Sequence, residues 1–332
     1  MTQQSNLVTG GAGYIGSHVV RQLGERGERV VVLDNLSTGF RESVLYGELV
    51  VGDTGDAKLV DTLLREHNIG AVLHFAANIV VPESVADPLK YYHNNTANTR
   101  SLLSCCQRAG IKHFIFSSTA AVYGIPEHIP VVEDAPLEPI NPYGRSKLMS
   151  EWMLRDLALA CPLRYIVLRY FNVAGADPAG RIGQSTPEAT HLLKVACEVV
   201  TGQRDKVSIF GTDYPTPDGT GVRDYIHIED LAAAHLKALD HLRAGGASNI
   251  LNCGYGHGYS VREVLDTVQR VAGQRITIVE SPRRAGDPPA LTANADRIRA
   301  TLGWQPRHDN LEFIVRTALD WERKLVAKRA RA

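Results

Sequence analysis

The chain has 332 residues, about two domains' worth of length, and its 36 Lys and Arg balance 36 Asp and Glu, so the formal net charge is zero. Without a net field, nucleic acid and anionic membrane surfaces are disfavoured as partners. The five cysteines form no Cys-x-x-Cys pair, which argues against a disulfide framework or a metal site and favours a reducing, cytoplasmic compartment.

Apolar stretches in this sequence are too short or too interrupted to cross a membrane. The longest mostly apolar run, Ile69–Val81, is interrupted by His74 and Asn78, and the N-terminal Met1–Gln4 is polar and uncharged. We therefore expect neither a signal peptide nor a transmembrane helix.

The first half of the chain alternates short β-branched runs with helical patterns, which is typical of βαβ units around a parallel sheet. The predicted strands are Asn6–Thr9, Arg29–Leu33, Glu48–Val51, Ala71–Phe75, His113–Ser117 and Arg164–Arg169. The predicted helices are Ile15–Glu25, Asp56–Glu66, Pro88–Arg108 and Pro142–Leu159. The pattern predicts an α/β protein with a Rossmann-like, doubly wound parallel sheet.

The second half has a different composition. Ala174–Glu188 and Gly211–Gly221 are rich in Gly, Pro and polar residues, as in loops that close over a site. The helical pattern Leu231–Leu242 and the strand-like Ser248–Cys253 are expected to return to the large sheet. We therefore expect a discontinuous division: a large unit of residues 1–174 plus about 222–254, and a smaller α+β unit of about 175–221 plus 255–332.

A glycine-rich turn follows the first predicted strand and opens the first predicted helix. Gly10, Gly13 and Gly16 stand where backbone must approach a pyrophosphate at a helix N-terminus. Asp34 follows Gly16 by eighteen residues, where a carboxylate can bind both ribose hydroxyls. That acid would repel a 2′-phosphate, and Asn35 follows it rather than an arginine, so the sequence predicts NAD rather than NADP.

Asp53, at the end of the third predicted strand, is a candidate acceptor for the adenine amino group. The alternative for Asp53 is an ordinary cap for the helix that begins near Asp56.

Tyr143 and Lys147 lie one helical turn apart, on one face of a predicted helix. A lysine beside a tyrosine stabilises the phenolate, so a phenol with an ordinary pKa of about 10 can act as a base closer to neutrality. Thr119 lies just after the strand His113–Ser117 and supplies a hydroxyl for a third role. The three residues predict acid–base chemistry.

The chain resembles the extended short-chain dehydrogenase/reductases and, within them, the UDP-glucose 4-epimerase family. The resemblance covers about residues 5 to 320 and is specific because five motifs occur in order. These motifs are Thr9–His18, Asp34–Leu36, Ser117–Gly124, Tyr143–Lys147 and Gly221–His227. Related 4,6-dehydratases carry Asp-Glu after the threonine, where this chain has Ala120 and Ala121, so the acid and base for elimination are missing.

The resemblance implies a redox-neutral reaction that interconverts UDP-galactose and UDP-glucose with a tightly bound NAD. Tyr143 takes the proton of the sugar 4-hydroxyl while hydride leaves C4, and hydride then returns to the other face of a 4-keto intermediate. Thr119 bonds the reacting oxygen, and Lys147 holds the nicotinamide ribose and lowers the Tyr143 pKa. His227 is expected to be a buried structural histidine rather than a catalyst.

The resemblance also assigns binding residues. Beside the residues already named, those for the cofactor are Tyr14, Ile15, Phe75, Ala76, Ala77, Asn95 and Tyr170, and those for the substrate are Asn172, His191, Leu192, Phe210, Arg223, Arg284, Asp287 and Leu291. Arginines suit a diphosphate because guanidinium pairs with phosphate oxygens bidentately. Two positions depart from relatives: Ile79, where some have a lysine near the cofactor, and His191, where some have asparagine.

The sequence leaves two alternatives to this function and also predicts how the chain assembles. The catalytic motifs do not distinguish UDP-hexoses from UDP-pentoses or UDP-N-acetylhexosamines, although the bulk of Leu291 favours sugars without an N-acetyl group. A binding protein without activity is a further alternative, because fold does not fix function. Related enzymes pair the segments Pro88–Arg108 and Pro142–Leu159 with a second copy, which predicts a homodimer.

Overall fold

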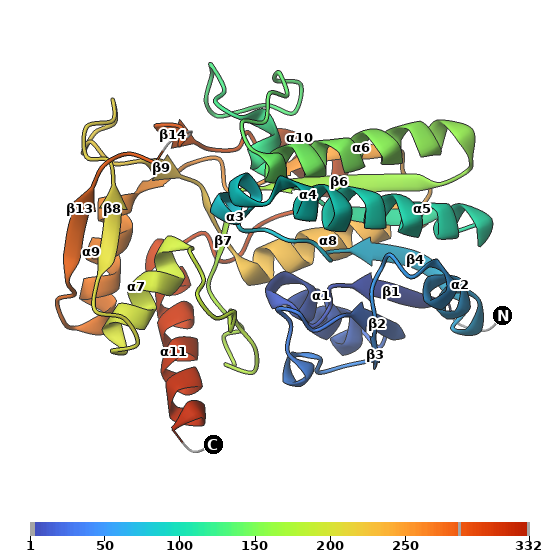
Figure 1. Ribbon diagram of the computed structural model, residues 1–332, viewed down its shortest axis with the longest axis horizontal. Coiled ribbons are helices and arrows are strands. Elements are labelled where there is room, and N and C mark those ends of the chain that lie inside the picture. Colours follow the sequence, from blue (N-terminus) through green and yellow to red (C-terminus); the bar gives the residue numbers. More distant parts are fainter. Residues whose placement is uncertain (1–3, 285–286, 331–332) are drawn as a thin grey trace.

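The structure is a computed structural model that describes residues 4–284 and 287–330. Residues 1–3, on which the expectation of no signal peptide partly rests, lie outside that part. At the centre is a seven-stranded parallel sheet in the order β11-β6-β5-β4-β1-β2-β3 (Figure 1). Its strands are β1 (Ser5–Thr9), β2 (Val30–Asp34), β3 (Glu48–Val51), β4 (Ile69–His74), β5 (His113–Ser117), β6 (Arg164–Tyr170) and β11 (Asn249–Cys253). The predicted doubly wound sheet is confirmed, and Ser248–Cys253 does return to it.

Helices cover both faces of the large sheet, as continuous apolar strands require. One face packs against α1 (Tyr14–Glu25) and α8 (Ile228–Arg243), and the other against α2 (Ala57–Glu66), α5 (Asn98–Arg108) and α6 (Pro142–Ala160). Side chains of β6 alternate accordingly: Ile166 and Leu168 join the core under α8, whereas Tyr165 and Val167 join the core under α6.

The predicted helix Pro88–Arg108 is interrupted. It consists of α4 (Pro88–Tyr91), a π-helical turn η2 (Tyr92–Ala97) and α5. The carbonyl of Asn95 accepts hydrogen bonds from the Thr99 hydroxyl at 2.7 Å and from the Ser150 hydroxyl of α6 at 3.0 Å. The Ser150 donor depends on the packing of α6 against this turn, so apolar periodicity could not reveal the turn.

A smaller region lies beside the carboxyl ends of the large sheet, at the left of Figure 1. There β8 (Val207–Phe210) pairs with β13 (Ile278–Ser281), and β9 (Val222–Arg223) lies between β12 (Tyr259–Ser260) and β14 (Ala290–Leu291). The helices of this region are α7 (Leu192–Val200), α9 (Val261–Ala272) and α11 (Leu311–Arg329). β7 (Asn172–Ala174) and β10 (Tyr225–His227) form a parallel pair where the chain passes between the regions. The remaining short elements are η1 (Arg41–Ser43), α3 (Val81–Ala86), η3 (Ala120–Tyr123) and α10 (Asp296–Leu302).

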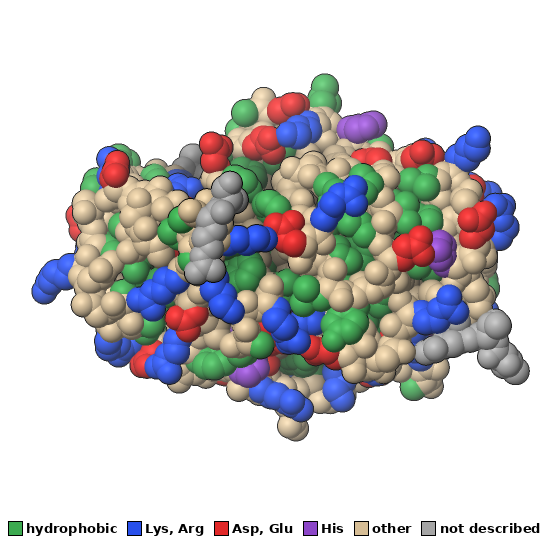
Figure 2. Space-filling model, turned by 90° about the horizontal axis from the view of Figure 1, so that it is seen from below, with side chains coloured by type: hydrophobic (Ala, Val, Ile, Leu, Met, Phe, Trp, Pro, Cys, Tyr) green, Lys and Arg blue, Asp and Glu red, His purple; other side chains and the backbone are tan. Residues whose placement is uncertain are grey.

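Charged side chains are mixed over the surface. Figure 2 shows basic and acidic groups interspersed on the face seen from below in Figure 1. Within residues 4–284 and 287–330, no helix is long and apolar enough to cross a membrane. The same residues contain no cluster of three or more His, Cys, Asp or Glu side chains placed to hold a metal ion.

Candidate active site

The glycines of the turn between β1 and α1 have different surroundings: Gly10 is closely packed, whereas the space at Gly13 is open. Gly10 has φ +70°, and a Cβ there would lie 2.6 Å from the Ala76 backbone nitrogen. A Cβ on Gly13 would meet a single atom, the Gly10 oxygen at 3.3 Å, so internal packing does not account for this glycine. Gly13 is also the N-cap of α1, and no side chain caps the helix there. The first turn of α1 therefore presents an open backbone cradle suited to a pyrophosphate.

Asp34 ends β2 beside this cradle and is largely buried. Its carboxylate accepts hydrogen bonds from the Ala12 amide at 2.9 Å and the Leu36 amide at 2.8 Å, which fixes its orientation toward the turn. Each carboxylate oxygen keeps a lone pair for a ribose hydroxyl. The side chain of Asn35 donates to Asp53 at 3.1 Å.

Asp53 does not cap α2. The cap is Asp56, whose side chain accepts from the Lys58 and Leu59 amides. Asp53 instead accepts from the Gly55 amide at 2.7 Å and the Asn98 side chain at 2.9 Å, which holds it at the carboxyl edge of the sheet. The alternative of a helix cap at Asp53 is therefore wrong.

The structure brings Thr119, Tyr143 and Lys147 together where β5 ends against α6. Asn141 caps α6 through the Gly144 amide at 2.9 Å, and Pro142 occupies its first turn, so the helix begins directly before Tyr143. Burial raises the pKa of Tyr143, while a hydrogen bond with Thr119 opposes the rise. The ring of Tyr91 stands edge-on to the Tyr143 ring, with centroids 6.4 Å apart.

Lys147 is almost fully buried under β5. Its ammonium donates to the Ser117 carbonyl at 2.8 Å and lies 5.0 Å from the centroid of the Phe116 ring. Burial lowers the pKa of Lys147 to about 7, and the Glu151 carboxylate opposes that shift. An ammonium has three donors, so two remain for a ligand in this position.

The segment after β4 lies beside the glycine turn. Phe75 packs against His235 with ring centroids 4.8 Å apart, and the Ala76 backbone closes on Gly10; Ala77 follows in the same loop. Asn95 exchanges two hydrogen bonds with the backbone of Asn78 and donates to Ser146 at 3.0 Å. Its amide thus ties this loop to α6.

Other predicted cofactor residues reach the same edge of the sheet. Ile15 packs against the core under α8, and the Tyr14 hydroxyl donates to the Gly175 carbonyl at 2.6 Å. Tyr170 is hydrogen-bonded to Ser117. His227 caps α8 and contacts Thr317 at 3.0 Å; burial lowers its pKa to about 3, which matches a structural histidine.

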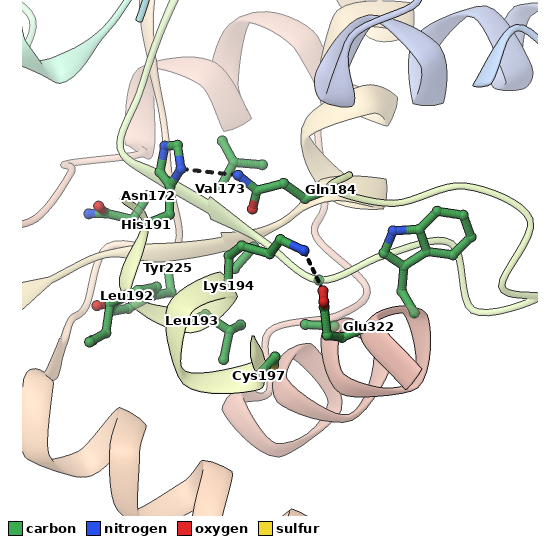
Figure 3. A pocket seen from close by; sticks show the side chains of 14 residues that line it. Asn172, Val173, Gln184, His191, Leu192, Leu193, Lys194, Cys197, Tyr225 and Glu322 are labelled. Atoms are coloured by element: carbon green, nitrogen blue, oxygen red, sulfur yellow. Dashed lines mark hydrogen bonds and ion pairs between the residues drawn. The ribbon is translucent and has the colours of Figure 1, made fainter. Parts of the chain in front are cut away.

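A pocket lies between β7, α7 and α11. Asn172, His191 and Leu192, three predicted substrate residues, all line it (Figure 3). His191 is the N-cap residue of α7, and its ring is hydrogen-bonded to Gln184 at 3.0 Å. Below them the Lys194 ammonium of α7 pairs with Glu322 of α11.

Phe210 and Arg284 meet at the outer end of the smaller region. The guanidinium carbon of Arg284 lies 3.7 Å from the centroid of the Phe210 ring. The Asp287 amide donates to the Arg284 carbonyl at 3.3 Å. An aromatic face and a cation are thus in direct contact, and the backbone of Asp287 lies beside them.

Arg223 and Leu291 are direct neighbours in the parallel pairing of β9 with β14. Arg223 donates to the Val222 carbonyl at 2.9 Å. Leu291 packs against the small core of Ala120, Val122, Tyr123, Val131 and Leu148, and therefore over the segment that follows Thr119. Leu291 therefore has a packing role in this core. Its place over the segment after Thr119 is also compatible with the predicted role at the sugar.

Two residues near the site, Tyr214 and Glu151, were missed from the sequence. Tyr214 is buried among the charges of Arg283, Asp287 and Arg223, and its hydroxyl has no hydrogen-bond partner among the residues that the structure describes. Glu151 continues the spacing of four residues from Tyr143 and Lys147. That spacing could have drawn attention to Glu151, whereas Tyr214 is recognisable only in three dimensions.

Sequence comparison relates this chain to known sugar-nucleotide epimerases. Residues 6–254 match the model of the NAD dependent epimerase/dehydratase family. A UDP-glucose 4-epimerase of Azospirillum brasilense is 61% identical over 320 residues, 96% of this chain and 92% of that protein.

Solved structures agree with this finding. A Stenotrophomonas maltophila UDP-glucose-4-epimerase with bound NAD and formylated UDP-arabinopyranose is 39% identical, with a TM-score of 0.95 over 98% of this chain and 100% of that one. The UDP-Glc/GlcNAc 4-epimerase of Campylobacter jejuni is 48% identical, with a TM-score of 0.85 over 97% and 99%. The chain belongs to the NAD dependent epimerase/dehydratase family, and these relatives are 4-epimerases of UDP-sugars.

Proposed function

We propose that this protein is a UDP-glucose 4-epimerase that interconverts UDP-galactose and UDP-glucose with NAD as its cofactor. The observation that carries the proposal is the junction of Thr119, Tyr143 and Lys147 with the open glycine turn of β1 and α1 at one end of the sheet. The neighbouring pocket and the Phe210–Arg284 pair supply complementary surfaces for a nucleotide sugar.

The residues present fit NAD. The uncapped N-terminus of α1 and the open space at Gly13 suit the pyrophosphate, Asp34 suits the adenosine ribose, and the two unused Lys147 donors suit the nicotinamide ribose. We assign the adenine edge to Asp53 and the floor of the site to Phe75–Ala77 and Tyr170. When bound, NAD supplies reversible acceptance of hydride from C4 of the sugar.

Tyr143 carries the proton. As a phenolate it takes the proton of the sugar 4-hydroxyl, and it returns that proton once the 4-keto sugar has turned its other face to the cofactor. The Thr119 hydroxyl bonds the reacting oxygen, and the buried Lys147 ammonium stabilises the phenolate. Because burial raises the pKa of Tyr143, the base depends on that charge.

The smaller region holds the nucleotide and leaves the hexose free to turn. We assign the diphosphate to Arg223, Arg284 and the N-terminus of α7 at His191 and Leu192, with Asn172 beside them. Phe210 borders the uracil and Asp287 binds the uridine ribose. Leu291 walls the sugar pocket. The ligand of the Stenotrophomonas maltophila structure, a UDP-sugar derivative, supports this class of substrate.

We extend the proposal to organisation and location. Residues 1–174 with about 222–254 form the cofactor unit, and about 175–221 with 255–332 form the substrate unit.

The protein is a homodimer through α4–α6. This is supported by the exposed Leu89, Met149 and Trp152 and by the groove of Tyr92, Thr96, Ala97, Arg100, Met149 and Met153. Light scattering tests this, and a mass near the 36.3 kDa chain would contradict it. The five free cysteines support a cytoplasmic location.

The function is tested by incubating the purified protein with UDP-galactose without added NAD and following UDP-glucose. We expect turnover from the cofactor that remains bound. Folded, NAD-loaded protein that forms no UDP-glucose would overturn the proposal and would favour a binding protein.

A further inference from the structure

Glu151 is a buried carboxylate to which the mechanism above gives no role. It lies on α6 four residues after Lys147 and eight after Tyr143, so the three side chains lie on one face of the helix at successive turns. Its residue exposure is only 2%, and a charge at such a depth requires partners.

Two side chains fix the position of this carboxylate. Arg169 of β6 binds both of its oxygens: Nε lies 3.1 Å from Oε1, and NH2 lies 2.6 Å from Oε2. The Ser118 hydroxyl, directly after β5, donates to Oε1. The carboxylate is therefore held from β5 and β6 while its own backbone belongs to α6.

Arg169 is itself held in place and is 1% exposed. It also donates to the Tyr123 hydroxyl at 3.0 Å and to the Glu133 carbonyl at 3.2 Å. Glu151 thus pairs directly with the buried Arg169, while the second buried cation, Lys147, precedes it by one turn on the same face of α6. Without the carboxylate, two uncompensated cations would lie under the same part of the sheet.

Within the described residues, the other groups in contact with Lys147 include no carboxylate. On α6 it follows the Tyr143 phenol by one turn, and β5 contributes the Ser117 carbonyl and the Phe116 ring. Burial lowers the pKa of His74 on β4 to about 3, so that imidazole is neutral, and Tyr170 on β6 is a phenol. Glu151 is the carboxylate that opposes the effect of burial on the pKa of Lys147.

We propose that Glu151 is a positioning residue of the reaction: clamped by Arg169 and Ser118, it keeps the Lys147 ammonium charged and aligned beside Tyr143. This inference rests on the proposed function, because it concerns the base of that reaction. The buried ion pair of Glu151 and Arg169 thus affects catalysis through Lys147 and not through contact with the substrate.

The test compares Glu151→Gln with Ser118→Ala. The first removes the charge and keeps the shape, whereas the second removes one hydrogen bond to the same carboxylate and keeps the charge. We expect the alkaline limb of the kcat–pH profile to move to lower pH by about one unit in E151Q, the size typical of losing an opposite charge within reach. The limb should stay in place in S118A. Glu151→Asp, which keeps the charge, should return the limb toward its original pH.

A measurement without turnover separates failure of this proposal from failure of the proposed function. A lysine whose pKa is lower in the folded than in the unfolded chain makes stability rise with pH between the two pKa values. The unfolding free energy should therefore begin to rise at lower pH in E151Q than in the original chain, and this rise should vanish when Lys147→Met is added.

If E151Q does not fold, the double variant E151Q/R169M removes both members of the ion pair and is measured in its place. It should shift both curves in the same direction by a smaller amount. Unshifted curves in the folded variant, or equal shifts in S118A, would overturn the proposal.

Discussion

The two sides of the active site differ in how completely they are built. On the catalytic side, Thr119 and Lys147 are buried and hydrogen-bonded to backbone: Lys147 donates to the Ser117 carbonyl of β5, and the Thr119 hydroxyl accepts from the Ala121 amide of η3. On the nucleotide side, the strands β9 and β14 have only two residues each. The arginines there make contacts within the protein: Arg284 lies on the Phe210 ring, and Arg223 donates to the Val222 carbonyl.

This difference separates chemistry from binding. The catalytic side is preorganised, so its groups act without rearrangement and their loss should reduce kcat. In the proposed assignment, the arginines of the nucleotide side exchange internal contacts for contacts with the substrate, so their loss should appear mainly in KM. A sugar that has to turn over between two hydride transfers suits a rigid base and an adaptable clamp on the nucleotide.

The largest expected effect comes from Tyr143→Phe, which removes the acid–base hydroxyl and keeps the ring. Turnover should fall by about two to four powers of ten, the usual contribution of a general acid–base group, with bound NAD retained. The matched control is Tyr91→Phe, because the hydroxyl of the neighbouring Tyr91 is engaged with Val80 and Glu83. Near-normal activity in Y143F would place the base elsewhere.

Arg223→Met should have an intermediate effect, in binding. Loss of a charge-assisted hydrogen bond to phosphate should raise KM for UDP-galactose by about ten- to a hundred-fold, with kcat changed little. Arg316→Met is the control, since Arg316 is exposed on α11 and pairs with Glu312. A fall in kcat at constant KM would contradict the division between the two sides.

Leu291→Ser should have the smallest effect, on the choice of sugar. If Leu291 crowds the 2-substituent while the ketose turns, the serine variant should gain about ten-fold in kcat/KM for UDP-N-acetylglucosamine relative to UDP-glucose. Leu137→Ser disturbs the same small core and should leave the ratio unchanged. Equal use of both sugars by the original protein would already refute the gate.

Local features of the site could be predicted from sequence because spacing alone specifies them. The glycines of the turn, Asp34 after β2 and the Tyr143–Lys147 pair each lie within one βα unit or one helical turn. The π-helical turn could not be predicted, because it depends on hydroxyls that reach the Asn95 carbonyl from Thr99 and Ser150.

Long-range pairs were equally inaccessible. Glu151 meets Arg169 across 18 residues, and Lys194 meets Glu322 across 128, so only the fold brings them together. The return of Ser248–Cys253 to the large sheet was predictable because Ile250 and Leu251 form a short strand-like apolar piece that has to be buried.

In the proposed mechanism the hydrogen at C4 leaves and returns as hydride, while Tyr143 exchanges only hydroxyl protons. Epimerisation of UDP-galactose in heavy water tests this directly, with the product examined by proton NMR and mass spectrometry. The account predicts UDP-glucose that retains protium at C4 and carries no carbon-bound deuterium. Deuterium at C4 would show that this position is deprotonated to solvent, and would contradict the mechanism.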